Sequence, residues 1–274
     1  MDQPPSSDEQ ERVQALLQDA DLRLFPIVGK GSTAVIRQIP HTDLALKVFS
    51  TLPCLEWIIP TKEGGAKRST TALRELYDCL LQAQAPLPKK TMLVDLTLTS
   101  SYQPDNYPDG IVMKYVPQLT MGVERWLHQE PFVNSYVELL GRLHAKGIVI
   151  SPEDLRRAHH HKNQALYHIP ALVDEQLILF DWTNLVTIDQ VLRYKGWESA
   201  NVDENYSQRA QLLLNDLREP NGFGELIHRY GEKYDSVKRK VETYLDSFCR
   251  NVNDQDFSAY YRETVHHQFR EVLF

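Results

Sequence analysis

The sequence predicts an α+β protein in which a small β-rich lobe with one main helix precedes a larger helical lobe. Residues 24–49 hold three β-rich runs separated by short polar turns, and two further runs follow at 91–98 and 111–116. From about residue 119 the apolar residues recur mostly at helical spacing. The chain has 274 residues, of which 42% are hydrophobic, and this is enough to build a sizeable core. We therefore expect lobes at residues 13–118 and 119–274.

The N-terminus is polar and acidic, which predicts a disordered tail over residues 1–12. Val13, Leu16, Leu17 and Ala20 then recur at helical spacing and predict a helix that packs on the small lobe. The sequence shows neither the pattern of a signal peptide nor the roughly 18 consecutive apolar residues of a membrane-spanning helix. Its three cysteines are widely spaced and form no disulfide or zinc pattern. We expect a cytoplasmic protein with no membrane partner.

A meander, a helix and two further strands make up the predicted small lobe. Residues 24–39 contain two β-rich runs around a Gly-Lys-Gly-Ser-Thr turn, and residues 44–49 are the third strand. Ser69 or Thr70 caps the next helix. Its apolar stripe consists of Leu73, Leu76, Tyr77, Leu80 and Leu81. The strands at 91–98 and 111–116 follow, joined by a turn-rich segment.

The predicted larger lobe begins with a helix and contains one clear strand. The helix places Val133, Tyr136, Val137, Leu140 and His144 on one face, and Lys146-Gly147 is a suitable C-terminal cap. Residues 177–182, LILFDW, are strongly β-forming. Three or four helices then complete the lobe, of which residues 233–248 have the clearest helical period.

Two features of the small lobe are candidates for phosphate binding. Gly29 and Gly31 lie in a strand-to-strand turn, where exposed backbone N–H groups can hold a phosphate. An ordinary hairpin that needs glycine for its geometry is the alternative. Lys47 lies inside an apolar strand, where its charge needs a phosphate or a carboxylate as partner. Glu75 on the following helix can supply the carboxylate, whereas a solvent-facing lysine is the alternative.

The order of these residues resembles the protein-kinase-like family. Gly29, Gly31 and Val35 match the glycine-rich loop, while Lys47 and Glu75 match the strand lysine and the helix glutamate. Three further segments extend the resemblance over roughly residues 22–190. Residues 111–116, which contain Met113, are similar to the fifth strand that leads into the interlobe hinge. Residues 136–150 are similar to the approach to the catalytic loop. Residues 177–182 are similar to the strand with the metal-binding aspartate, which here is Asp181.

The presumed catalytic loop departs from the family's pattern. Ile150-Ser151-Pro152 stands at the His-Arg-Asp positions, and an Asp-Leu pair returns only at Asp154-Leu155. His159 stands at the asparagine position, and the nearest asparagine is Asn163. Trp182-Thr183 replaces Phe-Gly, and no Ala-Pro-Glu follows. The loop is therefore degenerate by this comparison.

The resemblance implies a bilobal protein-kinase-like fold and an ATP- and Mg²⁺-dependent phosphotransferase with a small-molecule or otherwise atypical acceptor. In that hypothesis Gly29, Gly31, Val35, Lys47, Glu75 and Met113 form the nucleotide site. Asp181 and Asn163 hold magnesium, and Asp154 orients the acceptor hydroxyl. The departures leave two alternatives: a pseudokinase that acts as a binding or scaffold module, and a transferase that reuses the fold for adenylyl or aminoacyl transfer.

The charge pattern adds one candidate surface. The chain has 30 basic and 37 acidic residues and a net charge of −7, which argues against a general nucleic-acid binder. The densest basic stretch, RRAHHHK, lies next to the presumed catalytic loop and could receive an anionic substrate such as a phosphate or RNA. A flexible charged insertion is the alternative. The residues concerned are Arg156, Arg157, His159, His160, His161 and Lys162.

Overall fold

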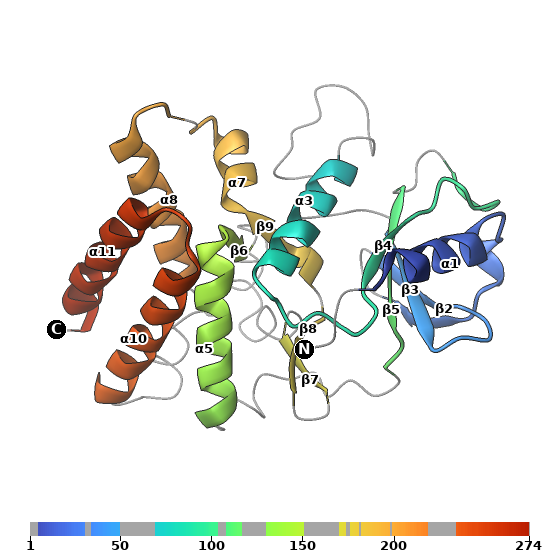
Figure 1. Cartoon of the computed structure of the whole chain (residues 1–274), viewed down its shortest axis with the longest axis horizontal. Coiled ribbons are helices and arrows are strands. Elements are labelled where there is room, and N and C mark those ends of the chain that lie inside the picture. The colour runs from blue at the N-terminus through green and yellow to red at the C-terminus, as the bar shows by residue number, and fades with distance from the viewer. Residues whose placement is uncertain are drawn as a thin grey trace. The chain divides into compact units, whose positions relative to one another are not determined.

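The computed structural model describes residues 5–30, 34–49, 69–103, 108–116, 130–150, 170–173, 176–180, 182–197, 199–218 and 234–273. It combines an antiparallel sheet with helices, which confirms the α+β class (Figure 1). The chain divides into two compact units. Unit 1 comprises Met1–Glu75 and Pro86–Leu119, and unit 2 comprises Leu76–Ala85 and Thr120–Phe274. One of the divisions falls inside helix α3 (Ser69–Gln82).

The described residues of unit 1 form a five-stranded antiparallel sheet in the order β1-β2-β3-β5-β4. The first three strands make the meander that the sequence predicts. Between β3 and β4 the chain passes through α3, so β4 is not held beside β3, and β5 pairs with both of them. The strands are β1 (Ile27–Lys30), β2 (Ala34–Gln38), β3 (Leu44–Phe49), β4 (Met92–Asp95) and β5 (Asp109–Lys114).

Strand β4 is shorter than the predicted strand over residues 91–98. The backbone N–H and the hydroxyl of Thr97 both donate to Asp95 Oδ1, at 2.8 and 2.6 Å. Such a local side-chain bond competes with the ladder and turns the chain. The alternating pattern therefore continues beyond the point at which pairing with β5 ends.

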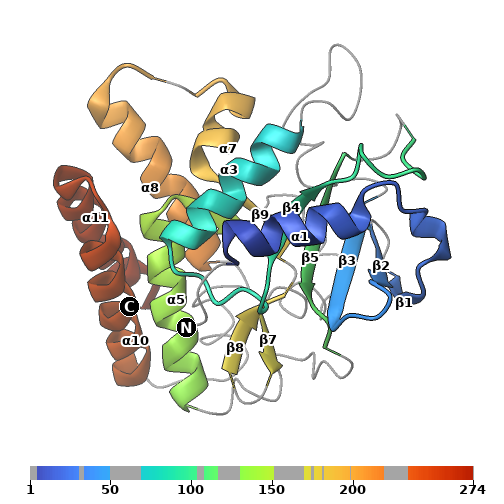
Figure 2. The same ribbon diagram turned by 45° about the vertical axis from the view of Figure 1, so that its right-hand side comes forward.

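Helix α1 (Ser7–Leu17) packs on one face of this sheet (Figure 2). Ser6 caps it by accepting from the Glu9 N–H, so residues 7–12 belong to a helix, and the expectation of a disordered tail over residues 1–12 is wrong for them. The side-chain amide of Gln14 bonds to the backbone oxygen and N–H of Asp95, at 2.8 and 2.9 Å, and so satisfies part of the free edge of β4. The core of this face consists of Val13, Leu17, Leu22, Ile39, Leu44, Leu46, Met92, Val94, Leu96 and Val112.

Unit 2 is mostly helical in its described part and carries two short strand pairs. Strand β6 (Ile148–Ile150) pairs with β9 (Leu185–Thr187), and β7 (Pro170–Val173) pairs with β8 (Gln176–Leu179). None of the helices that the structure describes combines the length and the apolar character needed to cross a membrane. The α-helices described in unit 2 apart from α3 are α5 (Glu130–Ala145), α7 (Ile188–Lys195), α8 (Val202–Arg218), α10 (Tyr234–Asn251) and α11 (Gln255–Leu273).

The core of unit 2 lies where α10 packs between α5 and α11 (Figures 1 and 2). Gly147 adopts a φ of +66° just after α5, which agrees with the cap predicted at Lys146-Gly147. His144, near the end of α5, is buried and bonds through its ring nitrogens to Asp216 on α8 at 2.9 Å and to Tyr244 on α10 at 2.7 Å. The Tyr244 and Tyr261 hydroxyls are 2.9 Å apart. This buried network connects four helices.

The buried tyrosines predict a loss of stability at high pH. Burial raises the pKa of Tyr77 to about 12 and holds the pKa values of Tyr244 and Tyr261 well above their usual range. An unfolded tyrosine ionises near pH ~10 while its folded form stays neutral, so each fully buried tyrosine costs about 1 kcal/mol of stability by pH ~11. The urea midpoint should therefore be steady up to pH ~9 and fall above it. Tyr261→Phe should reduce this slope, and an unchanged slope would contradict the assignment.

Candidate functional site

Lys47 lies in the middle of the unit 1 sheet, on the face opposite α1. Its register partners are Ile36 in β2 and Ile111 in β5, and directly paired residues of antiparallel strands point to the same face. Leu46, one residue earlier, faces the α1 core instead. The face that carries Lys47, here called the lysine face, is thus distinct from the face that α1 covers.

The Lys47 side chain is half-buried, and apolar residues lie next to it on this face. Its Nζ lies 5.3 Å from the centroid of the Phe49 ring, within range of a cation–π interaction. Ala45 and its partner Met113 are both buried on the same face, next to Lys47 along β3 and β5. A cationic group beside buried apolar side chains is complementary to a ligand in which an anionic group is joined to an apolar ring system.

Gly29 also belongs to the lysine face, whereas Val35 does not. Gly29 is the partner of Ile36, and a Cβ added at Gly29 would lie 3.3 Å from Ile36 Cδ1. Val35 is the partner of Val48, so it belongs to the face that α1 covers. Counted from Gly29 and with Ala34 as the third glycine, the loop pattern G-x-G-x-x-G-x-V also ends at Ile36. Ile36 is therefore a candidate site residue that the sequence analysis missed, although the spacing of the motif could have identified it.

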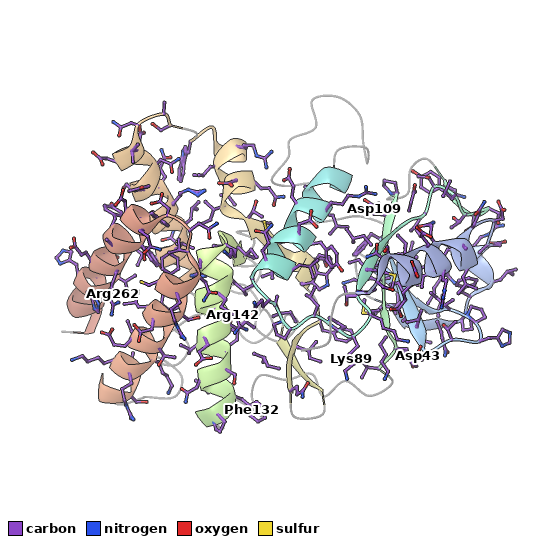
Figure 3. All side chains as sticks on the ribbon, viewed as in Figure 1. Asp43, Lys89, Asp109, Phe132, Arg142 and Arg262 are labelled. Carbon is purple, nitrogen blue, oxygen red and sulfur yellow. The ribbon has the colours of Figure 1, made fainter. Side chains whose placement is uncertain are left out.

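Glu75 lies on the part of α3 that belongs to unit 1. It is half-buried, and its neighbour Arg74 donates from Nη2 to Asp109 Oδ1 at 3.0 Å. Asp109, at the start of β5 (Figure 3), belongs to the lysine face because it is two residues before Ile111 on the same strand. Glu75 and Lys47 therefore both belong to unit 1, and Arg74, the residue before Glu75 in α3, is bonded to the lysine face.

The predicted chemistry of the larger lobe falls mainly on residues outside the described ranges. These are the metal ligands Asp181 and Asn163, the acceptor-orienting Asp154, and the basic stretch of Arg156, Arg157, His159, His160, His161 and Lys162. Gly31, the second glycine of the turn in the small lobe, also lies outside the described ranges. No group of three or more His, Cys, Asp or Glu side chains suited to a metal ion occurs within the described part of the chain.

Within unit 2, the strand that precedes Asp154 nevertheless pairs with the strand that follows Asp181. Ile150, which precedes Asp154 by four residues, is the register partner of Leu185, which follows Asp181 by four residues. Trp182, which stands in the family's phenylalanine position, is 1% exposed, and its ring centroid lies 5.7 Å from that of Tyr77. The last residue of β6 is thus paired with the first residue of β9.

The sequence was also compared with known proteins. The lysine face brings together Gly29, Ile36, Lys47 and Met113 by strand register, with Glu75 on the helix whose Arg74 bonds to the same face. Neither the models of known protein families nor the curated proteins gave a match to the chain.

Proposed function

We propose that the protein is an ATP- and Mg²⁺-dependent phosphotransferase of a bilobal, protein-kinase-like fold, with a small-molecule or otherwise atypical acceptor. The observation that carries the proposal is the register of the unit 1 sheet. It puts a residue from each of four strands, Gly29, Ile36, Lys47 and Met113, on the face that α1 leaves uncovered. These positions come from the segments that resemble the glycine-rich loop, the lysine strand and the fifth strand of the family.

The chain's own groups fit a nucleotide. The Lys47 ammonium neutralises the α- and β-phosphates, and Glu75 orients it. Gly29 lets the backbone of β1 approach the phosphates because it has no side chain. Ile36, Ala45 and Met113 supply an apolar surface for the base. Asp181 and Asn163 would hold magnesium, which would supply neutralisation of the developing phosphate charge.

Removal of Lys47 should weaken nucleotide binding specifically. A hydrogen bond to a charged group contributes about 1.5–3 kcal/mol, so Lys47→Ala should weaken Mg-ATP affinity roughly 10- to 150-fold in calorimetry. Lys114→Ala is the matched control, because Lys114 is an exposed lysine on the neighbouring strand β5 and belongs to the opposite face. Equal affinities in both variants, or no binding by the wild type at millimolar ATP, would overturn the proposal.

A nucleotide-binding module without turnover is the second candidate function. Ile150, at the first position of the family's His-Arg-Asp motif, is a strand residue paired with Leu185 rather than a loop residue. Pro152, two residues after Ile150, stands at the position of the base, so no carboxylate is present there. Product analysis separates the candidates. ADP formation that Asp181→Asn abolishes supports phosphoryl transfer, AMP and pyrophosphate indicate adenylyl transfer, and binding without either product indicates the module.

A further inference from the structure

Asp109 is a buried carboxylate with few partners in the part of the chain that the structure describes. Its side chain is 2% exposed, and its Oδ1 accepts from Arg74 at 3.0 Å. Its Oδ2 is also buried and has no hydrogen-bond partner among the described groups. The register partner of Asp109 in β4 is Asp95, a second acid on the same face. A buried carboxylate beside another acid is costly, so an apolar residue would be the more stable choice here.

The partner of Asp109 is situated very differently. The Arg74 side chain is 59% exposed, so the arginine does not need this bond to be solvated. The bond connects α3 to the first residue of β5, on the lysine face. The Arg74–Asp109 ion pair is therefore better explained by its effect on the position of α3 than by its effect on stability. Surface ion pairs contribute little to stability, and buried ones can often be replaced by apolar residues.

Apolar packing alone leaves the rotation of α3 loosely specified. Its buried residues in unit 1, Ala72 and Leu73, determine which side of the helix faces inward, but hydrophobic burial is not directional. A charge-assisted hydrogen bond depends on direction and distance. Glu75 follows Arg74 and is about 100° further around the helix, so an arginine anchored to the sheet also sets the direction of Glu75.

We infer that Asp109 is a positioning residue: by anchoring Arg74 it sets the orientation of the first half of α3, and through it the presentation of Glu75 to Lys47. The inference rests on the proposed nucleotide site. This role explains why a buried acid is present at position 109, where it is not needed for stability. Asp109 acts through Arg74 and Glu75, and it does not itself bind the nucleotide.

The test replaces the acid with an apolar residue of similar size. Asp109→Leu should leave the thermal midpoint equal to or above that of the wild type, because a buried carboxylate is removed and Arg74 is solvated. Mg-ATP affinity should nevertheless fall about tenfold. Asp43→Asn is the matched control, since Asp43 forms an exposed ion pair with Lys90 in the same unit, at 3.2 Å. It should change neither quantity.

Two further measurements identify the route of the effect. Adding Asp109→Leu to Glu75→Gln should cause no further loss of affinity, because both changes remove the same contact. Asp109→Leu should also speed hydrogen exchange in residues 69–82, with or without nucleotide. Unchanged exchange and affinity would overturn the inference while leaving the nucleotide site intact. A wild type that binds no Mg-ATP would overturn the nucleotide site, and faster exchange would then still support the anchoring of α3 by Asp109.

Discussion

Gly141→Val is expected to lower the free energy of unfolding by about 3 kcal/mol, because a side chain at this point of α5 collides with the backbone of α10. A Cβ at Gly141 would lie 2.6 Å from the Tyr244 backbone oxygen and 3.0 Å from the Phe248 nitrogen. Neither atom can move without distorting α10. Near this point the Ser247 hydroxyl of α10 also donates to the backbone oxygen of Glu138 in α5, at 2.7 Å. Urea unfolding monitored by helical circular dichroism measures the effect.

The control for this prediction is valine at an exposed position of the same helix. Asn134 is exposed on α5, so Asn134→Val changes helix propensity without a collision and should shift stability by less than about 0.5 kcal/mol. Gly141→Ala should lie between the two variants, since alanine gains about 1 kcal/mol of helix propensity but still meets α10. Equal urea midpoints for Gly141→Val and Asn134→Val would show that the two helices are not in close contact there.

Asp216→Ala is expected to cost about 3 kcal/mol, because it leaves the buried ring of His144 without its main partner. The two side chains are 3% and 0% exposed, and the Asp216 oxygen accepts from His144 Nε2 at 2.9 Å. With that proton on Nε2, the ring's Nδ1 accepts from the Tyr244 hydroxyl at 2.7 Å. Loss of the carboxylate therefore disturbs the contacts of α5, α8 and α10 together.

A double-mutant cycle separates the network from simple packing. The variant with both His144→Leu and Asp216→Leu should be more stable than the sum of the single losses predicts, because neither polar group is then left buried alone. Asp216→Asn keeps an acceptor oxygen and should lose only about 1 kcal/mol. Additive losses in the cycle would show that the two side chains contribute independently. Chemical unfolding of the four proteins at one pH is sufficient.

Several elements could be predicted from the sequence because their signals are local. The alternation over residues 24–49 predicts the meander β1–β3, and the apolar stripe from Leu73 to Leu81 predicts α3. Gly147 predicts the end of α5, and its φ is positive in the structure. Local signals also explain the differences. A bond from Thr97 to Asp95 ends β4 early, and the cap at Ser6 starts α1 inside the expected tail.

The candidate site could be predicted in part. The order of glycine turn, strand lysine and helix glutamate indicates Gly29, Lys47 and Glu75 from the sequence alone. It selected Val35 where the register favours Ile36, because a shift of one residue along a strand changes the face. Asp109 lay unrecognised in a turn-rich segment, since its importance comes from Arg74, which is 35 positions away.

The α+β class and the order of the elements in unit 1 follow from the sequence alone, since hydrophobic period, turn residues and caps act between neighbours in the chain. The partners of the buried polar groups do not. His144 is merely one member of a helix face in the sequence, yet in the fold it bonds to residues 72 and 100 positions away. Only tertiary packing decides such pairings and the face to which each strand residue belongs. Both depend on which distant segments exclude water from one another, and no local pattern records that.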